Sequence, residues 1–345
     1  MKLRKRLPIS RACLFAAAAL LSVAPRARAA NVFFDADNVT PAQLGAATVG
    51  ATGTWSDAFW YDAGTATTAT GDGAIATYIF TAADTAYFQG NKGTLTAAAE
   101  QTITLNGIND STGMTLSGGS LLLSGAGANI TVNGSVMSTI SSVITGTDGL
   151  IKAGTGDLKL AAANTYTGAT TINAGTLKIQ ANAFLTTARN YTIASGAVLN
   201  LDGTNRFASG TSTISGSGKL LITGGTLAGQ TSASPANVGN ISLGSGGTIE
   251  IASGASLYNG GWSSVYWASN LADLIVDGSL DIAGGRTVMV DALSGSGNIT
   301  QTQVVNTAII VGVDNGSSTF SGKIMNPSGT IALTKNGTGT LTLSG

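Results

Sequence analysis

The chain has 345 residues, of which 10% are charged and 48 are glycine. It has no histidine and one cysteine, Cys13, so Ser-His-Asp and Cys-His catalytic arrangements and His/Cys zinc sites are excluded. Since 43% of the residues are hydrophobic, the chain can bury a core, and the low charge with β-branched residues predicts many short strands rather than disorder.

Residues 1–29 have the features of a secretory signal peptide. A basic start is followed by an apolar run at 12–24 and by the small-x-small cleavage pattern Ala27-Arg28-Ala29. We expect cleavage after Ala29, with Ala30 as the alternative. This step removes Cys13 and seven of the 17 basic residues but no acidic one, which leaves a net charge of 10 − 17 = −7. The acidic balance argues against nucleic acid and anionic membrane as partners.

Residues 30–98 are predicted to form an N-terminal cap. Aromatic side chains concentrate here, in the segments 52–64 and 81–93. A solenoid needs an atypical end repeat to cover its first coil. We therefore expect a β-rich cap of antiparallel character.

Short apolar phrases recur through residues 99–345. In each phrase, alternating apolar residues form the period-2 pattern of a half-buried strand, and glycines that tolerate positive φ mark turns on either side. No helical segment of ten or more residues separates them. Because near-identical phrases are typical of stacked coils, an all-β parallel β-helix is favoured over a β-sandwich. The phrases are "GSLLLSG" (119–125), "GKLLITGG" (218–225), "GTIEIASG" (247–254) and "DGSLDIAGG" (277–285).

A longer repeat is also present. "LIKAGTGDLKLAA" (150–162) and "LTKNGTGTLTLSG" (333–345) are identical at seven of thirteen positions, and "STFSG" (318–322) echoes "NTYTG" (164–168). The first copy and its continuation closely resemble the autotransporter-associated β-strand repeat, also called the passenger-associated transport repeat. We assign repeats to 149–179 and, incompletely, to 318–345. The matching positions are Leu150, Lys152, Gly154, Gly156, Leu158, Leu160, Asn164, Tyr166, Gly168, Thr170, Ile172, Gly175 and Leu177.

This resemblance implies a right-handed parallel β-helix at the surface of a diderm bacterium. It also implies passage through the outer membrane with the help of translocation machinery, a step that the repeat is associated with. The second copy stops inside the repeat at Gly345, and neither a translocator barrel nor a sorting tail follows in the sequence. We therefore expect a fragment of a longer passenger that associates through its last coil.

The alternation within the first repeat predicts which side chains face the core. We expect six apolar residues to point inward, namely Leu150, Leu158, Leu160, Ile172, Leu177 and Ile179. Three lysines are expected to point outward, namely Lys152, Lys159 and Lys178.

Three aspartates are the remaining candidates for chemistry. Asp273, Asp277 and Asp281 are spaced by four, so Asp273 and Asp277 on one strand face would suit the paired acids of a polysaccharide-cleaving enzyme. Gly278 instead suggests a turn with solvated acids, which is the interpretation we favour. A calcium site is a third alternative, although the nonapeptide of calcium-binding β-rolls is absent.

The segment 258–270 is the candidate ligand-binding loop. It contains Tyr258, Trp262, Tyr266 and Trp267, whose rings could stack on sugars, and loops that interrupt a solenoid often carry function. The alternative is that these rings cover the flank of the helix.

Together these observations predict a non-enzymatic cell-surface passenger with a structural or adhesin-like role. We expect no cofactor and no metal, and surface glycans or a host or neighbouring cell surface as partners. The alternative is a β-helical carbohydrate-active enzyme, a polysaccharide lyase or glycosidase that uses aspartates.

Overall fold

The computed structural model describes the strands between residues 31 and 105, and residues 107–345 apart from 125–127, 181–188, 204, 207–210, 229–237, 260–264 and 268. The predicted signal peptide and Trp262 lie outside the described residues. The described residues form strands and turns without a helix, which confirms the all-β prediction. In this part of the chain, therefore, no helix has the length and hydrophobicity needed to cross a membrane.

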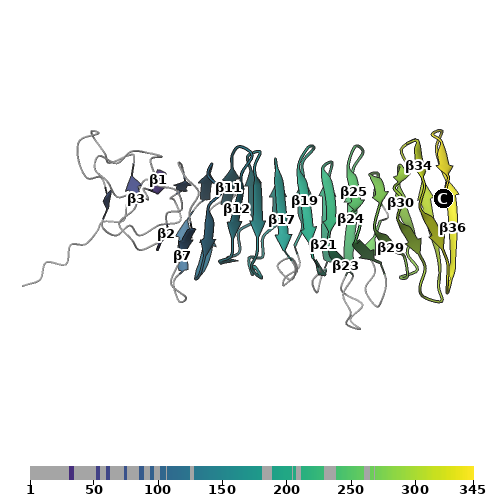
Figure 1. Cartoon of the computed structure of the whole chain (residues 1–345), viewed down its shortest axis with the longest axis horizontal. Helices are drawn as coiled ribbons and strands as arrows, with labels where there is room; N and C mark the ends of the chain where they lie inside the picture. Colours follow the sequence, from purple (N-terminus) through teal and green to yellow (C-terminus); the bar gives the residue numbers. More distant parts are fainter. Residues whose placement is uncertain are drawn as a thin grey trace, which may run out of the picture.

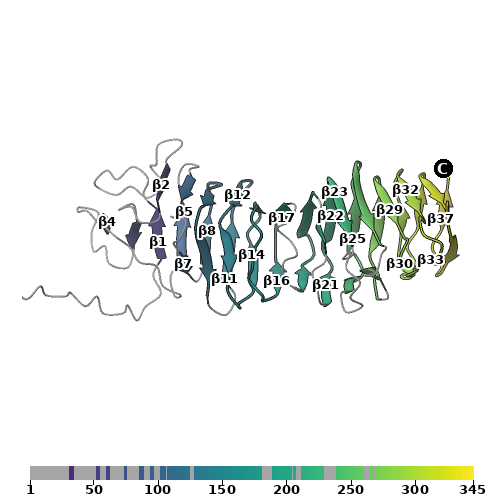
Figure 2. The ribbon, with the colours of Figure 1, turned by 90° about the horizontal axis from the view of Figure 1, so that it is seen from below.

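The strands stack into one elongated solenoid, seen from two directions in Figures 1 and 2. Two long sheets run along it. The first has twelve strands in the spatial order β27 (Val265–Tyr266), β24 (Val238–Leu243), β21 (Thr211–Gly216), β18 (Tyr191–Ile193), β16 (Thr170–Ile172), β14 (Leu150–Ala153), β11 (Ala128–Val132), β8 (Gly107–Asp110), β5 (Thr85–Phe88), β1 (Asn31–Phe34), β3 (Trp60–Asp62) and β4 (Ala74–Ile75). The second has eleven, β2 (Thr52–Thr54), β6 (Thr94–Thr96), β9 (Thr115–Ser117), β12 (Met137–Ile140), β15 (Asp157–Leu160), β17 (Thr176–Gln180), β19 (Val198–Asp202), β22 (Lys219–Thr223), β25 (Thr248–Ile251), β28 (Asp273–Val276) and β31 (Leu293–Ser294).

Shorter sheets complete the stack. A three-stranded sheet contains β13 (Val143–Thr145), β10 (Ser120–Leu123) and β7 (Thr102–Leu105). A six-stranded sheet contains β20 (Asn205–Arg206), β23 (Gly225–Ala228), β26 (Ala255–Tyr258), β29 (Ser279–Asp281), β32 (Asn298–Thr300) and β35 (Lys323–Met325). The C-terminal coils add a sheet of β30 (Val288–Val290), β33 (Asn306–Val311) and β36 (Thr330–Lys335), and a pair of β34 (Ser318–Phe320) and β37 (Leu341–Leu343).

Each strand of the solenoid pairs in parallel with the strand one coil away. From β6 onward in the eleven-stranded sheet, the step from one coil to the next varies from 19 residues, between Leu158 and Leu177, to 29 residues, between Leu220 and Ile249. The first pair of that sheet, β2 and β6, is separated by 42 residues, from Thr52 to Thr94. A sandwich of antiparallel hairpins would give a different pairing, so the parallel solenoid prediction is confirmed. The right-handed sense stays a prediction.

The strands before residue 99 join the same sheets. β1 pairs in parallel with β5, and β2 pairs in parallel with β6, while β1–β3 and β3–β4 are antiparallel. Parallel stacking is therefore present among the described strands of the predicted cap. The proposed domain boundary at residue 98 stays a prediction.

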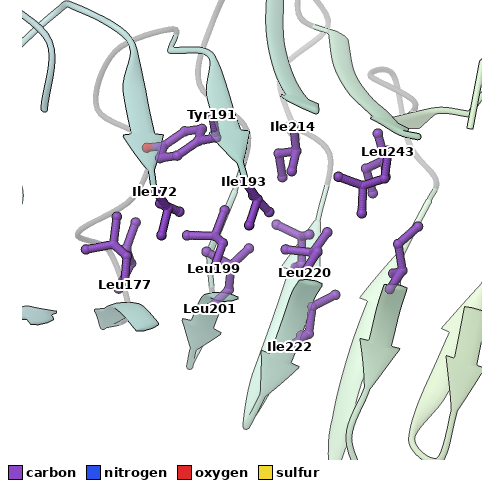
Figure 3. Close-up of a cluster of buried hydrophobic side chains, with 14 of the residues drawn as sticks. Ile172, Leu177, Tyr191, Ile193, Leu199, Leu201, Ile214, Leu220, Ile222 and Leu243 are labelled. Carbon is purple, nitrogen blue, oxygen red and sulfur yellow. The ribbon is translucent and has the colours of Figure 1, made fainter. Parts of the chain in front are cut away.

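The core consists of ladders of identical or similar side chains, one rung per coil. Leu158, Leu177, Leu199 and Leu220 follow one another in register, and each is fully buried. Figure 3 shows part of this cluster between the two long sheets. Like residues pack on like because each coil repeats the same inward positions. All six apolar residues of the first repeat that we expected to face inward are buried.

The predicted orientation of the lysines is correct at two positions and wrong at the third. Lys159 and Lys178 lie on the outer face of the eleven-stranded sheet, and the Lys178 ammonium forms a 3.1 Å ion pair with Asp202. Lys152, by contrast, is 0% exposed. It lies on β14 two residues after the inward Leu150, so the alternation of the strand turns its side chain into the solenoid.

Candidate functional site

The first repeat forms one coil whose turn is built by glycines. Gly154 directly follows β14 and has φ = +74°, and a Cβ there would lie 2.2 Å from the carbonyl oxygen of Val132 in the preceding coil. A Cβ on Gly175 would lie 2.3 Å from the carbonyl oxygen of Gly156. Only glycine permits this backbone approach, so these motif positions set how tightly successive coils stack.

The Lys152 ammonium lies inside this turn. Its Nζ donates hydrogen bonds to the carbonyl oxygens of Ala153 (2.8 Å), Gly154 (2.8 Å) and Ala174 (3.1 Å). Burial lowers the pKa of Lys152 from 10.5 to about 8, and the nearby Asp157 carboxylate opposes part of this effect. The third acceptor belongs to the following coil, so the lysine connects two coils.

Asn164 of the motif connects the segment after β15 to the preceding coil through a hydrogen bond. Asn164 is buried, and its Oδ1 accepts a 2.8 Å hydrogen bond from the backbone N–H of Ile144. The N–H groups of Thr165 and Thr167 donate to the carbonyl oxygens of Ile144 and Gly146. A segment without strand pairing therefore still follows the path of the coil beneath it.

Tyr166 is held by a residue of its own coil and by a residue of the following coil. Its hydroxyl lies 2.7 Å from the Thr170 hydroxyl, and burial raises the pKa of the phenol. From the following coil, the Arg189 guanidinium covers the ring at 3.9 Å from its centre and donates to the carbonyl oxygens of Tyr166 and Asn164, both at 2.6 Å. Arg189 is 3% exposed. The motif residues Asn164, Tyr166 and Thr170 thus act as packing and hydrogen-bonding elements.

The second copy repeats the local part of this arrangement. The Lys335 Nζ donates to the carbonyl oxygens of Asn336 and, at 3.4 Å, of Gly337, which has φ = +66°. These acceptors lie one and two residues after the lysine, as they do at Lys152. Ahead of it, Phe320 is buried like its counterpart Tyr166.

The four aromatic residues of the candidate ligand-binding loop have different environments. Trp267 is 1% exposed and packs in the hydrophobic core, so it offers no ring face to a ligand. Tyr258 and Tyr266 are half-buried. The Tyr258 hydroxyl accepts a 3.0 Å hydrogen bond from Gln303 Nε2, and the Arg286 guanidinium lies 4.3 Å from the centre of the Tyr266 ring. Trp262 lies outside the described residues, and ligand binding by this loop stays a prediction.

Each of the three candidate aspartates is tied to the next coil. Asp273 accepts from the backbone N–H of Ala292 at 3.1 Å, and Asp277 accepts from the N–H of Ser296 at 3.0 Å. Burial is the main cause that raises the pKa of Asp273. Of the three, only Asp277 is exposed, in the turn between β28 and β29, whereas Asp273 and Asp281 are half-buried strand residues. Among the described residues, no three acidic, histidine or cysteine side chains are grouped as they would be to hold a metal ion.

The family model of the passenger-associated transport repeat matches residues 150–179 and 333–345. These two segments are passenger-associated transport repeats. The chain is also 39% identical over 157 residues to an adhesin autotransporter, BmaC, of Brucella suis biovar 1 (strain 1330). That alignment covers 45% of this chain and 4% of the relative. No solved structure matches the chain significantly.

Two structural features of the first repeat and its surroundings were not predicted from the sequence. One is the inward position of Lys152. The other is Arg189, which lies ten residues beyond Ile179 and completes the environment of Tyr166. The position of Arg189 could have been inferred from strand alternation. It lies two residues before the buried Tyr191, and residues two apart in an extended segment point to the same face.

Proposed function

We propose that the chain is part of an exported, non-enzymatic passenger that displays a β-solenoid at the surface of a diderm bacterium and acts as an adhesin or structural stalk. The observation that carries this proposal is the presence of passenger-associated transport repeats within a continuous parallel solenoid. The similarity to part of an autotransporter adhesin supports the adhesin-like role. The predicted signal peptide supports export.

The flank that carries the aromatic segment is the proposed ligand side. Tyr258 and Tyr266 come from one coil, and their polar partners Arg286 and Gln303 come from the next two coils. Rings combined with planar polar groups suit the apolar faces and hydroxyl groups of sugars. Surface glycans of a host or neighbouring cell are therefore the proposed partner class, and nucleic acid is not.

Export is tested with the full chain carrying an epitope inserted at the exposed turn Ser253–Gly254, whose side-chain space is open. In a diderm host that supplies outer-membrane translocation machinery, the epitope should be accessible to antibody on intact cells or in the medium. A matched chain that lacks residues 1–29 should keep the epitope inside the cell. Detection of the epitope only after lysis of cells carrying the complete chain would refute export.

Adhesion is tested with the purified chain immobilised on beads and a panel of neutral and acidic glycans. We expect the wild type to retain at least one glycan class and Tyr266→Ala to lose this retention. Lys159→Gln, which changes a residue on the outer face of the eleven-stranded sheet, should behave like the wild type. Equal retention by all three proteins, or retention by none, would contradict the proposed ligand side.

The non-enzymatic part is tested by the release of reducing or unsaturated ends from the same glycans. We expect no turnover by the wild type or by Asp277→Asn. Turnover that disappears in Asp277→Asn would establish the alternative carbohydrate-active enzyme.

A further inference from the structure

Lys152 occupies a position where the neighbouring coils have isoleucine. In register with it lie Ile130 in the preceding coil and Ile172 in the following coil, and both are buried. A lone ammonium in this ladder would carry a large desolvation cost unless its donors were satisfied. Among the described residues, Lys152 forms no ion pair with a carboxylate, so its partners have to be neutral groups.

Three backbone carbonyls supply those partners. An ammonium group has three N–H donors, and the carbonyl oxygens of Ala153, Gly154 and Ala174 accept one hydrogen bond each. The first two belong to the last residue of β14 and to the first residue of the turn that follows it. The third belongs to the turn of the next coil, which approaches closely because Gly175 has no Cβ: a Cβ there would lie 2.8 Å from the Gly154 carbonyl oxygen.

The local part of this arrangement recurs in the second copy of the repeat. Lys335 in the second copy directs its Nζ to the carbonyl oxygens one and two residues further on, and Gly337 adopts the same left-handed conformation as Gly154. Two sequence-related turns thus each present two carbonyl oxygens to a lysine amino group, although Lys335 is exposed and Lys152 is buried. Arginine would not suit this geometry, because its planar fork cannot direct donors to three converging acceptors.

We propose that the glycine turn of the repeat is a binding site for a primary amino group, which Lys152 fills from within the chain, and that this bound amino group joins one coil to the next. The ligand class is a primary alkylamine, bound as ammonium near neutral pH. This inference does not depend on the proposed surface function, because it concerns the stability of the solenoid itself.

Chemical rescue of the full chain tests the site. Lys152→Ala removes the side chain beyond Cβ, which has the composition of n-propylammonium. We expect the melting temperature of Lys152→Ala to fall by several degrees and to recover in part with added n-propylammonium chloride. Tetramethylammonium chloride at the same ionic strength has no N–H donor and should give no recovery. Lys159→Ala, in the same coil but on the outer face, should melt like the wild type with either salt.

Equal effects of the two salts on Lys152→Ala would overturn the proposal. An unchanged melting temperature in Lys152→Met would also overturn it, because methionine keeps an unbranched side chain, one heavy atom shorter, without N–H donors. If the substituted chains fail to fold, the wild type gives the answer through the ¹⁵N resonance of its lysine amino groups. A Lys152 amino group in slow exchange with solvent, coupled through hydrogen bonds to carbonyl carbons, supports the site. A Lys152 amino group that exchanges as fast as that of Lys159 overturns it.

Discussion

The Arg189 guanidinium lies 3.9 Å from the centre of the Tyr166 ring and donates through Nε to the carbonyl oxygen of the same tyrosine. Arg189 belongs to the coil that follows, so one side chain contacts both the ring and the backbone of the repeat. Together with Lys152, it places a second cation inside the stack, and both are bound mainly by carbonyl oxygens. The repeat is thus held together by buried cations that bridge successive coils.

Arg189→Leu should destabilise the solenoid. The substitution removes the two hydrogen bonds from the guanidinium to the carbonyl oxygens of Asn164 and Tyr166, and a hydrogen bond from a charged group is worth about 1.5–3 kcal/mol. The lost ring contact adds roughly 0.5–2 kcal/mol. We expect the free energy of unfolding, measured by denaturant titration, to fall by about 2–4 kcal/mol.

Arg286→Leu is the matched control for this prediction. Its guanidinium also lies over a tyrosine ring, at 4.3 Å from the centre of Tyr266, but the side chain is exposed. An exposed contact of this kind is worth about 0.5–1 kcal/mol. Equal losses in Arg189→Leu and Arg286→Leu would show that the buried hydrogen bonds contribute nothing.

Stability should rise with pH at the alkaline side because of Lys152. Its pKa is about 8 in the folded chain and 10.5 as the ordinary value, so the unfolded chain binds more protons between these two values. The free energy of unfolding therefore increases as the pH rises from about 8 to 10.5, by about 3 kcal/mol for the full shift. Below pH 8 the lysine is charged in both states and its contribution is constant.

The difference between the wild type and Lys152→Met isolates this effect, since the other titrating groups are common to both. Denaturant titrations at a series of pH values should give diverging curves above pH 8 for this pair. Lys159→Met should follow the wild type throughout. Parallel curves for the wild type and Lys152→Met would mean that Lys152 titrates as it does in water.

Strand alternation predicted most of the core. The prediction was wrong at Lys152, where the charge of the side chain was given more weight than its position in the alternation. Leu158 and Leu160 were assigned correctly because apolar character and period 2 agree there. At Lys152 the two conflict: parity with Leu150 points inward, whereas a charged side chain usually lies outside. The structure follows parity because carbonyl oxygens of two coils satisfy the ammonium.

Strand alternation also accounts for the aromatic residues of the candidate loop. Trp267 lies two residues after the buried Val265 and points into the core as Val265 does, whereas Tyr266 lies on the outer face of β27. The contacts between distant residues could not be predicted, because they depend on coil lengths that vary from one coil to the next. Tyr258 and Gln303, for example, are 45 residues apart and meet across an intervening coil.

Leu160→Ala tests the core ladder. Leu160 is 1% exposed and lies in register between Ile140 and Ile179, so its removal leaves a cavity bounded by both neighbouring coils. The free energy of unfolding should fall by about 2–5 kcal/mol. Leu221→Ala is the control, because Leu221 points outward between two buried residues of β22, and it should cost about 1 kcal/mol or less. A loss in Leu160→Ala no larger than in Leu221→Ala would contradict the register.

Gly175→Ala and Gly196→Ala separate the two reasons for glycine in this fold. Both residues have positive φ, at +63° and +78°, so an alanine at either position carries a backbone strain of about 1–2 kcal/mol. They differ in space: a Cβ on Gly196 meets nothing within 4 Å, whereas a Cβ on Gly175 would lie 2.3 Å from the Gly156 carbonyl oxygen. In Gly175→Ala the two coils have to separate, which lengthens the hydrogen bond from Lys152 to Ala174 and the hydrogen bonds between the paired strands.

We expect Gly175→Ala to lose more stability than Gly196→Ala, by about 2 kcal/mol or more, in the range of overpacking substitutions. Hydrogen exchange should locate the added opening at β15 and β17. Equal losses and equal exchange in the two variants would show that left-handed conformation alone explains the repeat's glycines, and that close stacking of the coils does not.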